Sequence, residues 1–161
     1  MKLYIKQKVF SWTDRFNITD ASGREIYRAE GEFLSWGKKL HVYTSSGGEA
    51  AYIAQKIFSF LPCYYIYRHG REVAEIVKRF TFFTPMYTIH GLGWEIEGDF
   101  FAHNYSITDN GRTIITVRKE WFTWGDCYEL DIADDTDEVN ALCAALVIDC
   151  VMAAASSSAA T

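Results

Sequence analysis

The sequence is poor in proline and in basic residues, and its cysteines form no paired motif. Only two prolines occur in 161 residues, so few positions prevent the chain from pairing in strands. Lysine and arginine (16) are outnumbered by aspartate and glutamate (21), which gives a net charge of −5. This balance argues against a nucleic-acid binder and against a strongly basic membrane-binding surface. Without a CxxC pair, we expect reduced thiols in a cytoplasmic protein at Cys63, Cys127, Cys143 and Cys150.

Signatures of catalysis and targeting are also missing. The chain has no G-x-S-x-G motif, no P-loop and no Cys–His signature. Its histidines, at His41, His69, His90 and His103, lack the spacing of metal ligands. Residues 1–6 alternate like a strand and lack the apolar core of a signal peptide. We therefore predict no catalytic residue, no cofactor and no metal.

What the sequence does contain is a sixfold repeat of aromatic and β-branched segments, at residues 8–18, 32–42, 56–66, 79–89, 97–107 and 120–130. Each segment ends on an apolar residue: Ile18, Val42, Ile66, Ile89, Ile107 and Leu130. Two residues earlier stands a second large apolar residue: Phe16, Leu40, Tyr64, Tyr87, Tyr105 or Tyr128. A more polar residue separates the two, and this alternation indicates strands with one buried face. Near the start of each segment we expect Val9, Phe33, Ile57, Phe80, Gly98 and Trp121 to face inward too.

Turn residues divide the repeats into twelve strands. One set of turns is expected within the repeats, at residues 13–14, 37–38, 61–62, 84–85, 102–103 and 125–126. The second set lies between them, at residues 21–23, 46–48, 69–70, 91–93 and 110–111. The resulting meander, over residues 2–132, is long enough to close on itself and so remove its edges. We predict a mainly β protein, a closed twelve-stranded antiparallel up-and-down barrel.

The C-terminal segment predicts one helix over residues 137–155, with a frayed tail at 156–161. It is apolar on every face, which is typical of a membrane span or of a helix buried on all sides. Asn140 and Asp149 interrupt the run, and no basic residue follows it. These features favour burial, and we expect the barrel to enclose the helix within a single domain of residues 1–161 and no transmembrane segment.

Several stretches resemble the LURP-one-related family. They are residues 98–111 (GDFFAHNYSITDNG), residues 119–132 (KEWFTWGDCYELDI) and the pattern from Lys56 to Tyr67. The resemblance covers the whole chain and implies a tubby C-terminal-like fold, a closed twelve-stranded barrel around a hydrophobic C-terminal helix. It also implies kinship with the phospholipid scramblases and with tubby proteins, which bind phosphoinositide headgroups. It supplies no catalytic residue.

Two sets of residues are candidate binding sites at the barrel mouths. An aromatic residue recurs in each unit at one mouth: Trp12, Trp36, Phe60, Phe83, Phe101 and Trp124. These rings form either a rim that touches a lipid interface or apolar ligand, or a plug that covers one end of the helix. At the other mouth an anion site, or simply solvated turn residues, is expected at Arg24, Arg71, Arg112 and His69.

Two acidic features have alternative interpretations. Asp149 lies inside the apolar helix and is either an ion or proton site or a satisfied polar group of the core. The acidic run before the helix, residues 131–138, lacks the spacing of a calcium loop and favours helix capping.

These observations favour a non-catalytic binding or scaffold module that acts peripherally at a phospholipid membrane surface, with a phospholipid or a protein as partner. Two alternatives stay open at this point. One is a lipid-scramblase-like protein with an inserted C-terminal helix. The other is an enzyme with a small-molecule site at one barrel mouth.

Overall fold

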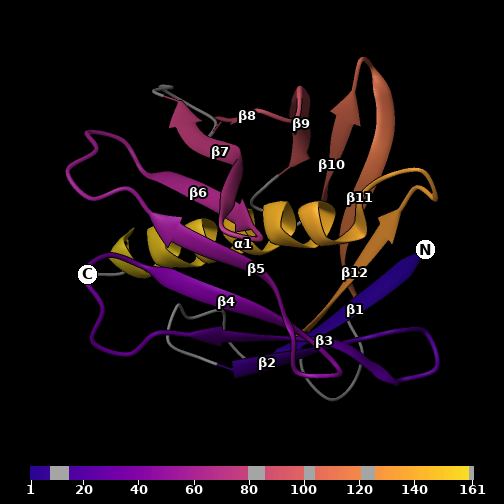
Figure 1. Ribbon diagram of the computed structural model, residues 1–161. Coiled ribbons are helices and arrows are strands. Elements are labelled where there is room, and N and C mark those ends of the chain that lie inside the picture. Colours follow the sequence, from indigo (N-terminus) through magenta and orange to yellow (C-terminus); the bar gives the residue numbers. More distant parts are fainter. Residues whose placement is uncertain (8–14, 80–85, 100–103, 121–125, 160–161) are drawn as a thin grey trace.

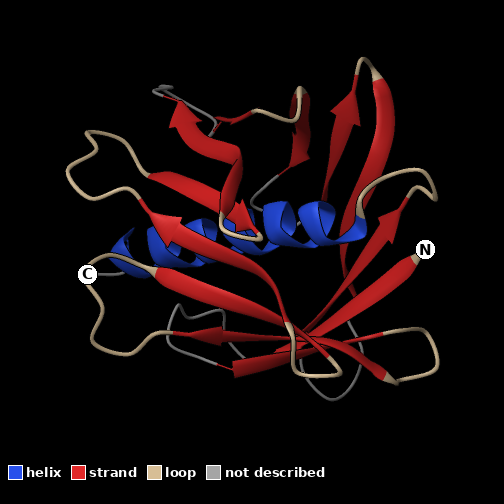
Figure 2. Cartoon of the chain, viewed as in Figure 1, coloured by secondary structure: helices blue, strands red, loops and turns tan. Residues whose placement is uncertain are grey.

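The computed structural model describes residues 1–7, 15–79, 86–99, 104–120 and 126–159. Twelve strands form a closed barrel, and one helix runs through it (Figures 1 and 2). The elements are β1 (Lys2–Gln7), β2 (Arg15–Thr19), β3 (Glu25–Gly31), β4 (Lys39–Thr44), β5 (Glu49–Gln55), β6 (Cys63–Arg68), β7 (Arg71–Arg79), β8 (Met86–His90), β9 (Trp94–Asp99), β10 (Asn104–Asp109), β11 (Arg112–Glu120), β12 (Asp126–Ile132) and α1 (Glu138–Ala159).

The barrel is an antiparallel up-and-down meander in which each strand pairs with its neighbours in sequence. Strand β12 closes it by pairing with β1, from Lys2 opposite Asp131 to Gln7 opposite Asp126. Among the described strands, closure gives each one two hydrogen-bonded neighbours, which removes the usual route to edge-to-edge aggregation. The predicted architecture is confirmed.

The two ends of the barrel differ in their connections. At the short-turn end, which is defined by the turns β2–β3, β4–β5, β6–β7, β8–β9 and β10–β11, connections run from two to five residues. The long-loop end carries the connections within the repeats, including residues 32–38 and 56–62. Since β12 runs toward the short-turn end, α1 begins there and ends at the long-loop end.

The helix fills the barrel, as its uniformly apolar sequence predicts. All residues from Ala141 to Met152 are buried. The small side chains of Ala144 and Ala145 and the larger ones of Leu146 and Ile148 all lie inside the barrel, and none of the four is exposed to solvent. A helix buried on every side needs no polar face, so the absence of an apolar stripe follows from its position.

The ends of α1 differ slightly from the prediction. The helix begins at Glu138 and continues through residues 156–158, predicted to fray, as far as Ala159. No glycine or proline follows residue 155 to stop it, and serine is an acceptable helix residue. At its start the Asp137 carboxylate accepts hydrogen bonds from the Asn140 backbone N–H (2.8 Å) and from Arg68 Nη1 (2.8 Å).

The two inward columns of the repeat line the barrel, as predicted. The column Phe16, Leu40, Tyr64, Tyr87, Tyr105 and Tyr128 is at most 6% exposed, and the column Ile18, Val42, Ile66, Ile89, Ile107 and Leu130 at most 2%. Both pack in one cluster with the helix. Burial of these side chains against the helix is the main source of stability. The inward faces of the strands and the helix bury their apolar surface only against each other.

The prediction that Phe33 and Ile57 face inward is wrong. Their exposed fractions are 77% and 45%. Strands β3 and β5 end at Gly31 and Gln55, so both residues lie in loops where the strand alternation no longer applies. Gly98, the equivalent residue in β9, has no side chain and adopts φ +127°. The other three members of that column, Val9, Phe80 and Trp121, lie outside the described residues.

Asp149 is fully buried and belongs to a polar contact between wall and helix. Its Oδ1 accepts a hydrogen bond from the Tyr105 hydroxyl at 3.2 Å, and the same hydroxyl lies 3.4 Å from the Ala145 carbonyl oxygen. Burial, followed by the Asp149 charge, raises the pKa of Tyr105 well above its ordinary value, so this hydroxyl stays a donor. The contact supports the interpretation of Asp149 as a polar group of the core that fixes the position of α1 relative to β10.

We expect Tyr105→Phe to lower the free energy of unfolding by about 1–3 kcal/mol, because it removes a donor to a buried carboxylate. Urea denaturation followed by tryptophan fluorescence measures the change. Tyr65→Phe, on the outer surface of β6, is the matched control and should stay within about 0.5 kcal/mol of the unmodified protein. Equal effects of the two substitutions would show that the Tyr105–Asp149 contact does not stabilise the fold.

Candidate functional site

Two neighbouring loops at the long-loop end expose large apolar side chains. In the loop 32–38, Phe33, Leu34 and Trp36 are 77%, 88% and 81% exposed. In the loop 56–62, Ile57, Phe58 and Phe60 are 45%, 96% and 98% exposed. The loops are adjacent on the rim because the strands β4 and β5 that flank them pair. We call these six residues the apolar rim; in Figure 1 both loops project on the side where α1 ends.

The apolar rim is held in place by the backbone of its two loops. Leu34 and Phe58, which are equivalent in the repeat, both adopt the left-handed conformation, with φ of 65° and 62°. Bulky side chains rarely adopt it, and such strain is typical of functional segments. Lys38 and Gln55 join the bases of the loops, since the Gln55 N–H donates to the Lys38 carbonyl oxygen at 2.7 Å. The loops therefore present their apolar tips in a defined conformation.

Two of the six aromatic residues predicted at this mouth can be placed. Trp36 and Phe60 point into solvent and neither of them covers the end of the helix. Trp12, Phe83, Phe101 and Trp124 lie outside the described residues. Sequence reasoning missed Leu34 and Phe58 because it assigned their neighbours to strands. The sequence did contain a signal for these two loops. In both, four or five consecutive apolar or small residues interrupt the alternating pattern of a strand.

The cations predicted to form an anion site are spread around the short-turn end. Arg24 binds Asp20 (Nη2 to Oδ2, 3.0 Å), and Arg112 binds both oxygens of Asp135 at 2.6 and 2.8 Å. Arg24, Arg71 and Arg112 lie at the starts of β3, β7 and β11, which are four strands apart in the barrel. Four strands span about 19 Å of wall, so these arginines do not converge on one pocket.

The acidic run before α1 is occupied by contacts within the chain. Asp134 lies 3.4 Å from the N-terminal amine, Asp135 binds Arg112 and Asp137 caps the helix. In the described part of the chain, no group of three or more His, Cys, Asp and Glu residues is placed to hold a metal ion. These contacts agree with a capping and tethering role for the run.

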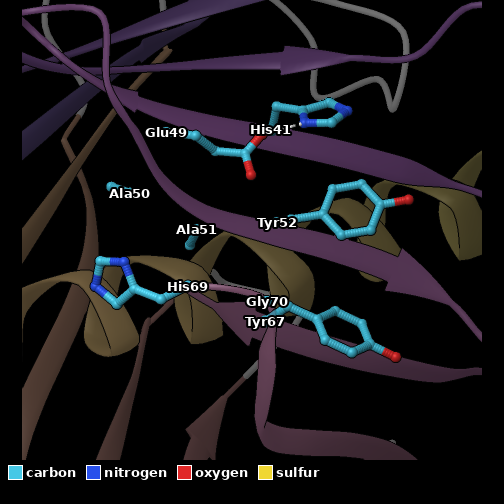
Figure 3. A pocket seen from close by; sticks show the side chains of 8 residues that line it. All are labelled: His41, Glu49, Ala50, Ala51, Tyr52, Tyr67, His69 and Gly70. Atoms are coloured by element: carbon cyan, nitrogen blue, oxygen red, sulfur yellow. Dashed lines mark hydrogen bonds and ion pairs between the residues drawn. The ribbon is translucent and has the colours of Figure 1, made fainter.

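His69 belongs to a groove on the outer wall, between the β4–β5 turn and the β6–β7 turn. Its volume is about 340 Å³, and it is lined by His41, Glu49, Ala50, Ala51, Tyr52, Tyr67, His69 and Gly70 (Figure 3). In Figure 3 the rings of Tyr52 and Tyr67 lie side by side, and His69 lies on the other side of Ala51. The groove therefore combines aromatic walls with a floor of small residues.

A β-bulge explains why the groove is there. Where β5 pairs with β4, the register shifts and Ala50 is left unpaired. The same shift leaves Ile26, Val73 and Ile114 unpaired in three other hairpins. Those three side chains pack against the core or are buried in it. Ala50 carries only a methyl group at this bulge position, and it lines the groove.

His41 joins the groove to the base of the apolar rim. Its Nδ1 lies 2.8 Å from Glu49 Oε2, and its Nε2 lies 2.8 Å from Glu32 Oε1. A neutral imidazole can donate from only one nitrogen, so both contacts are hydrogen bonds only when the ring is protonated. Burial opposes this charge, but the hydrogen bonds to Glu32 and Glu49 outweigh it and raise the pKa of His41 above 6.5.

We expect His41 to contribute a pH-dependent term to stability. Because its folded pKa is raised, the contribution is complete below the unfolded pKa of about 6.5 and is lost as the pH rises through the folded pKa. The loss should stay below about 1 kcal/mol, as for other partly exposed ion pairs. Urea unfolding across this pH range should show this loss of stability with rising pH in the unmodified protein and in His90→Gln, but not in His41→Gln. A His41→Gln profile parallel to that of the unmodified protein would contradict it.

The described residues include no helix with both the length and the apolar character needed to cross a bilayer. All four cysteines are free thiols.

Comparison with known proteins agrees with this architecture. The family model described as LURP-one-related matches residues 1–149. The uncharacterized protein YxjI of Bacillus subtilis (strain 168) is 40% identical over 152 residues, which cover 94% of each chain. An X-ray structure of a protein from Arabidopsis thaliana superposes with a TM-score of 0.67 at 10% identity, over 93% of this chain and 90% of that one. The structural likeness, at this identity, concerns the fold.

Proposed function

The chain belongs to the LURP-one-related family, and from this premise we propose that it is a non-catalytic binding module that docks on phospholipid membranes through the apolar rim. The exposure of Phe33, Leu34, Trp36, Phe58 and Phe60, between 77% and 98%, is the observation that carries the proposal. Exposed apolar groups of this size mark surfaces that contact a membrane or a partner. Trp and Phe residues at a loop tip suit the boundary between headgroups and acyl chains.

The neighbouring charges favour docking driven by apolar burial. Lys38 is exposed and can reach headgroup phosphates, whereas Lys56, at the base of its loop with about half of its side chain exposed, lies 3.9 Å from Glu75. Glu32 occupies the equivalent place beside Lys39, which it binds at 3.2 Å. With a net charge of −5 for the whole chain, attraction to anionic lipid adds little, and salt should weaken binding only slightly.

The contacts of α1 favour docking over an inserted helix. Residues 141–152 are buried among twelve strands, with exposed fractions of 8% or less. A scramblase-like insertion would have to withdraw these side chains from the barrel and leave its inward columns in water. Docking through the apolar rim requires no such rearrangement.

The thiols support a non-catalytic role. Burial, followed by a hydrogen bond to Glu75, raises the pKa of Cys63 to about 12, and burial raises that of Cys143 to about 12. A nucleophilic cysteine needs a lowered pKa, because the thiolate is the reactive form. Neither thiol is therefore suited to nucleophilic catalysis.

Vesicle flotation tests the proposal. We expect the protein to float with neutral phosphatidylcholine vesicles and slightly better with vesicles that also contain phosphatidylserine, with little loss at high salt. Failure to float with either vesicle would overturn the proposal. Binding restricted to anionic vesicles and abolished by salt would contradict the role of the apolar rim.

A further inference from the structure

A row of aromatic rings crosses the outer face of β4, β5 and β6. His41 stacks near Tyr43 with ring centroids 6.0 Å apart and packs against Tyr52 at 4.8 Å. The row continues from Tyr52 to Tyr67 at 5.9 Å and from Tyr67 to Tyr65 at 6.2 Å. The outward positions of three adjacent strands thus form one aromatic surface.

The chain's own cations already sit on this surface. The Arg28 guanidinium lies 5.6 Å from the ring centroid of Tyr43, and the Lys56 ammonium lies 5.5 Å from that of Tyr65. His41, which contacts two carboxylates, packs its ring against Tyr52. A cation over an aromatic face is attracted by the negative potential of the ring. Both ends of the row are therefore occupied by positive charge, and His41 covers the ring of Tyr52.

Tyr67 is the exception in this row. In the described ranges of the chain, no lysine or arginine lies over its ring. Glu72 is its partner across the β6–β7 pair. Burial, followed by the Glu72 charge, raises the pKa of Tyr67, so its hydroxyl stays protonated. The groove that Ala50 leaves open gives access to this position from solvent.

We propose that the groove binds an organic cation, namely the guanidinium group of an arginine presented by a protein partner. A guanidinium is planar and weakly hydrated, stacks on aromatic faces and binds carboxylates through a fork of N–H donors. Tyr67 and Tyr52 supply the aromatic faces, and Glu49, whose side chain is 48% exposed and whose Oε2 contacts His41, supplies its second carboxylate oxygen at the edge of the groove. The floor of Ala50, Ala51 and Gly70 offers no competing charge.

The position of the groove gives this site a role in a scaffold. It opens near the short-turn end, whereas the apolar rim lies at the long-loop end. A protein docked on a bilayer through the rim would therefore keep the groove free for a partner. The cation site does not depend on that docking, because none of its residues belongs to the rim.

Titration of the full-length ¹⁵N-labelled protein tests the inference. The probe is N-acetylarginine amide, and N-acetylcitrulline amide, of nearly the same shape without the charge, is its control. We expect saturable amide shifts at Ala50, Ala51 and Gly70 with the arginine probe alone. No saturable shift, or equal shifts with the citrulline probe, would overturn the proposal.

Variants then locate the site. Ala50→Ile fills the groove with the kind of side chain that the equivalent hairpins carry, and Tyr67→Leu removes the free aromatic face; each should weaken binding about tenfold. Tyr67→Phe, which keeps the aromatic face, and Tyr65→Leu, outside the groove, should bind as the unmodified protein does.

If Ala50→Ile does not fold, the comparison of probe binding by Tyr67→Leu and by Tyr67→Phe is sufficient as the test. Unchanged binding by folded Tyr67→Leu would overturn the proposal. A Trp36→Ser/Phe60→Ser variant should bind the probe normally, which separates this result from any failure of membrane docking.

Discussion

Removal of residues 139–161 is expected to leave a chain that does not fold. The deletion takes away α1, which packs with the inward columns of the barrel in one hydrophobic cluster. The five largest aliphatic side chains buried within it are Leu142, Leu146, Val147, Ile148 and Val151. At about 1.5–3 kcal/mol for each, they contribute about 8–15 kcal/mol, as much as the whole stability of a typical domain.

The deletion is read out by near-UV circular dichroism and by the dispersion of amide resonances. Leu146→Ala supplies a graded control that should fold and lose about 2–5 kcal/mol. Addition of a synthetic peptide of residues 138–159 should restore the native spectrum in part. A truncated chain that stays folded would show that the C-terminal segment is dispensable, as expected of a membrane anchor and not of a core.

Substitution of both Trp36 and Phe60 by serine is expected to weaken membrane binding about a hundredfold or more. Burial of one large apolar side chain is worth about 1.5–3 kcal/mol, and about 2.7 kcal/mol for the pair already corresponds to a factor of one hundred. Stability should not fall, because the two side chains are 81% and 98% exposed and make no core contact.

The measurement is vesicle flotation across a range of lipid concentrations, with urea unfolding as the check on stability. Tyr43→Ser, on the outer wall of β4 near the short-turn end, is the matched control, since it also replaces an aromatic residue by serine but lies away from the apolar rim. Equal binding by the double variant and the unmodified protein would show that the rim does not contact the bilayer.

Much of the fold could be predicted from the sequence because it depends on local alternation repeated six times. The positions of Tyr64 and Ile66, and of their equivalents, follow from a period of two in each strand. The place of α1 follows from the absence of any polar face. Where the strands end could not be predicted in the same way: Phe33 and Ile57 continue the apolar pattern in sequence, but β3 and β5 end just before them.

The groove could not be predicted from the sequence because it depends on the register between neighbouring strands. Tyr52 meets Tyr67 only because β5 and β6 pair in one particular register. His41 lies between Glu32 and Glu49, which are nine residues before it and eight after it. The one available signal was small: Ala50 stands where the repeat has Ile26 and Val73.

The most direct test of membrane docking is quenching of Trp36 fluorescence by lipids brominated in the upper acyl chain. Trp36 is 81% exposed at the tip of its loop, so docking through the apolar rim places its indole among those bromines. We predict quenching in the unmodified protein that is reduced in Trp36→Phe. Absence of quenching, or quenching that persists undiminished in Trp36→Phe, would contradict the account.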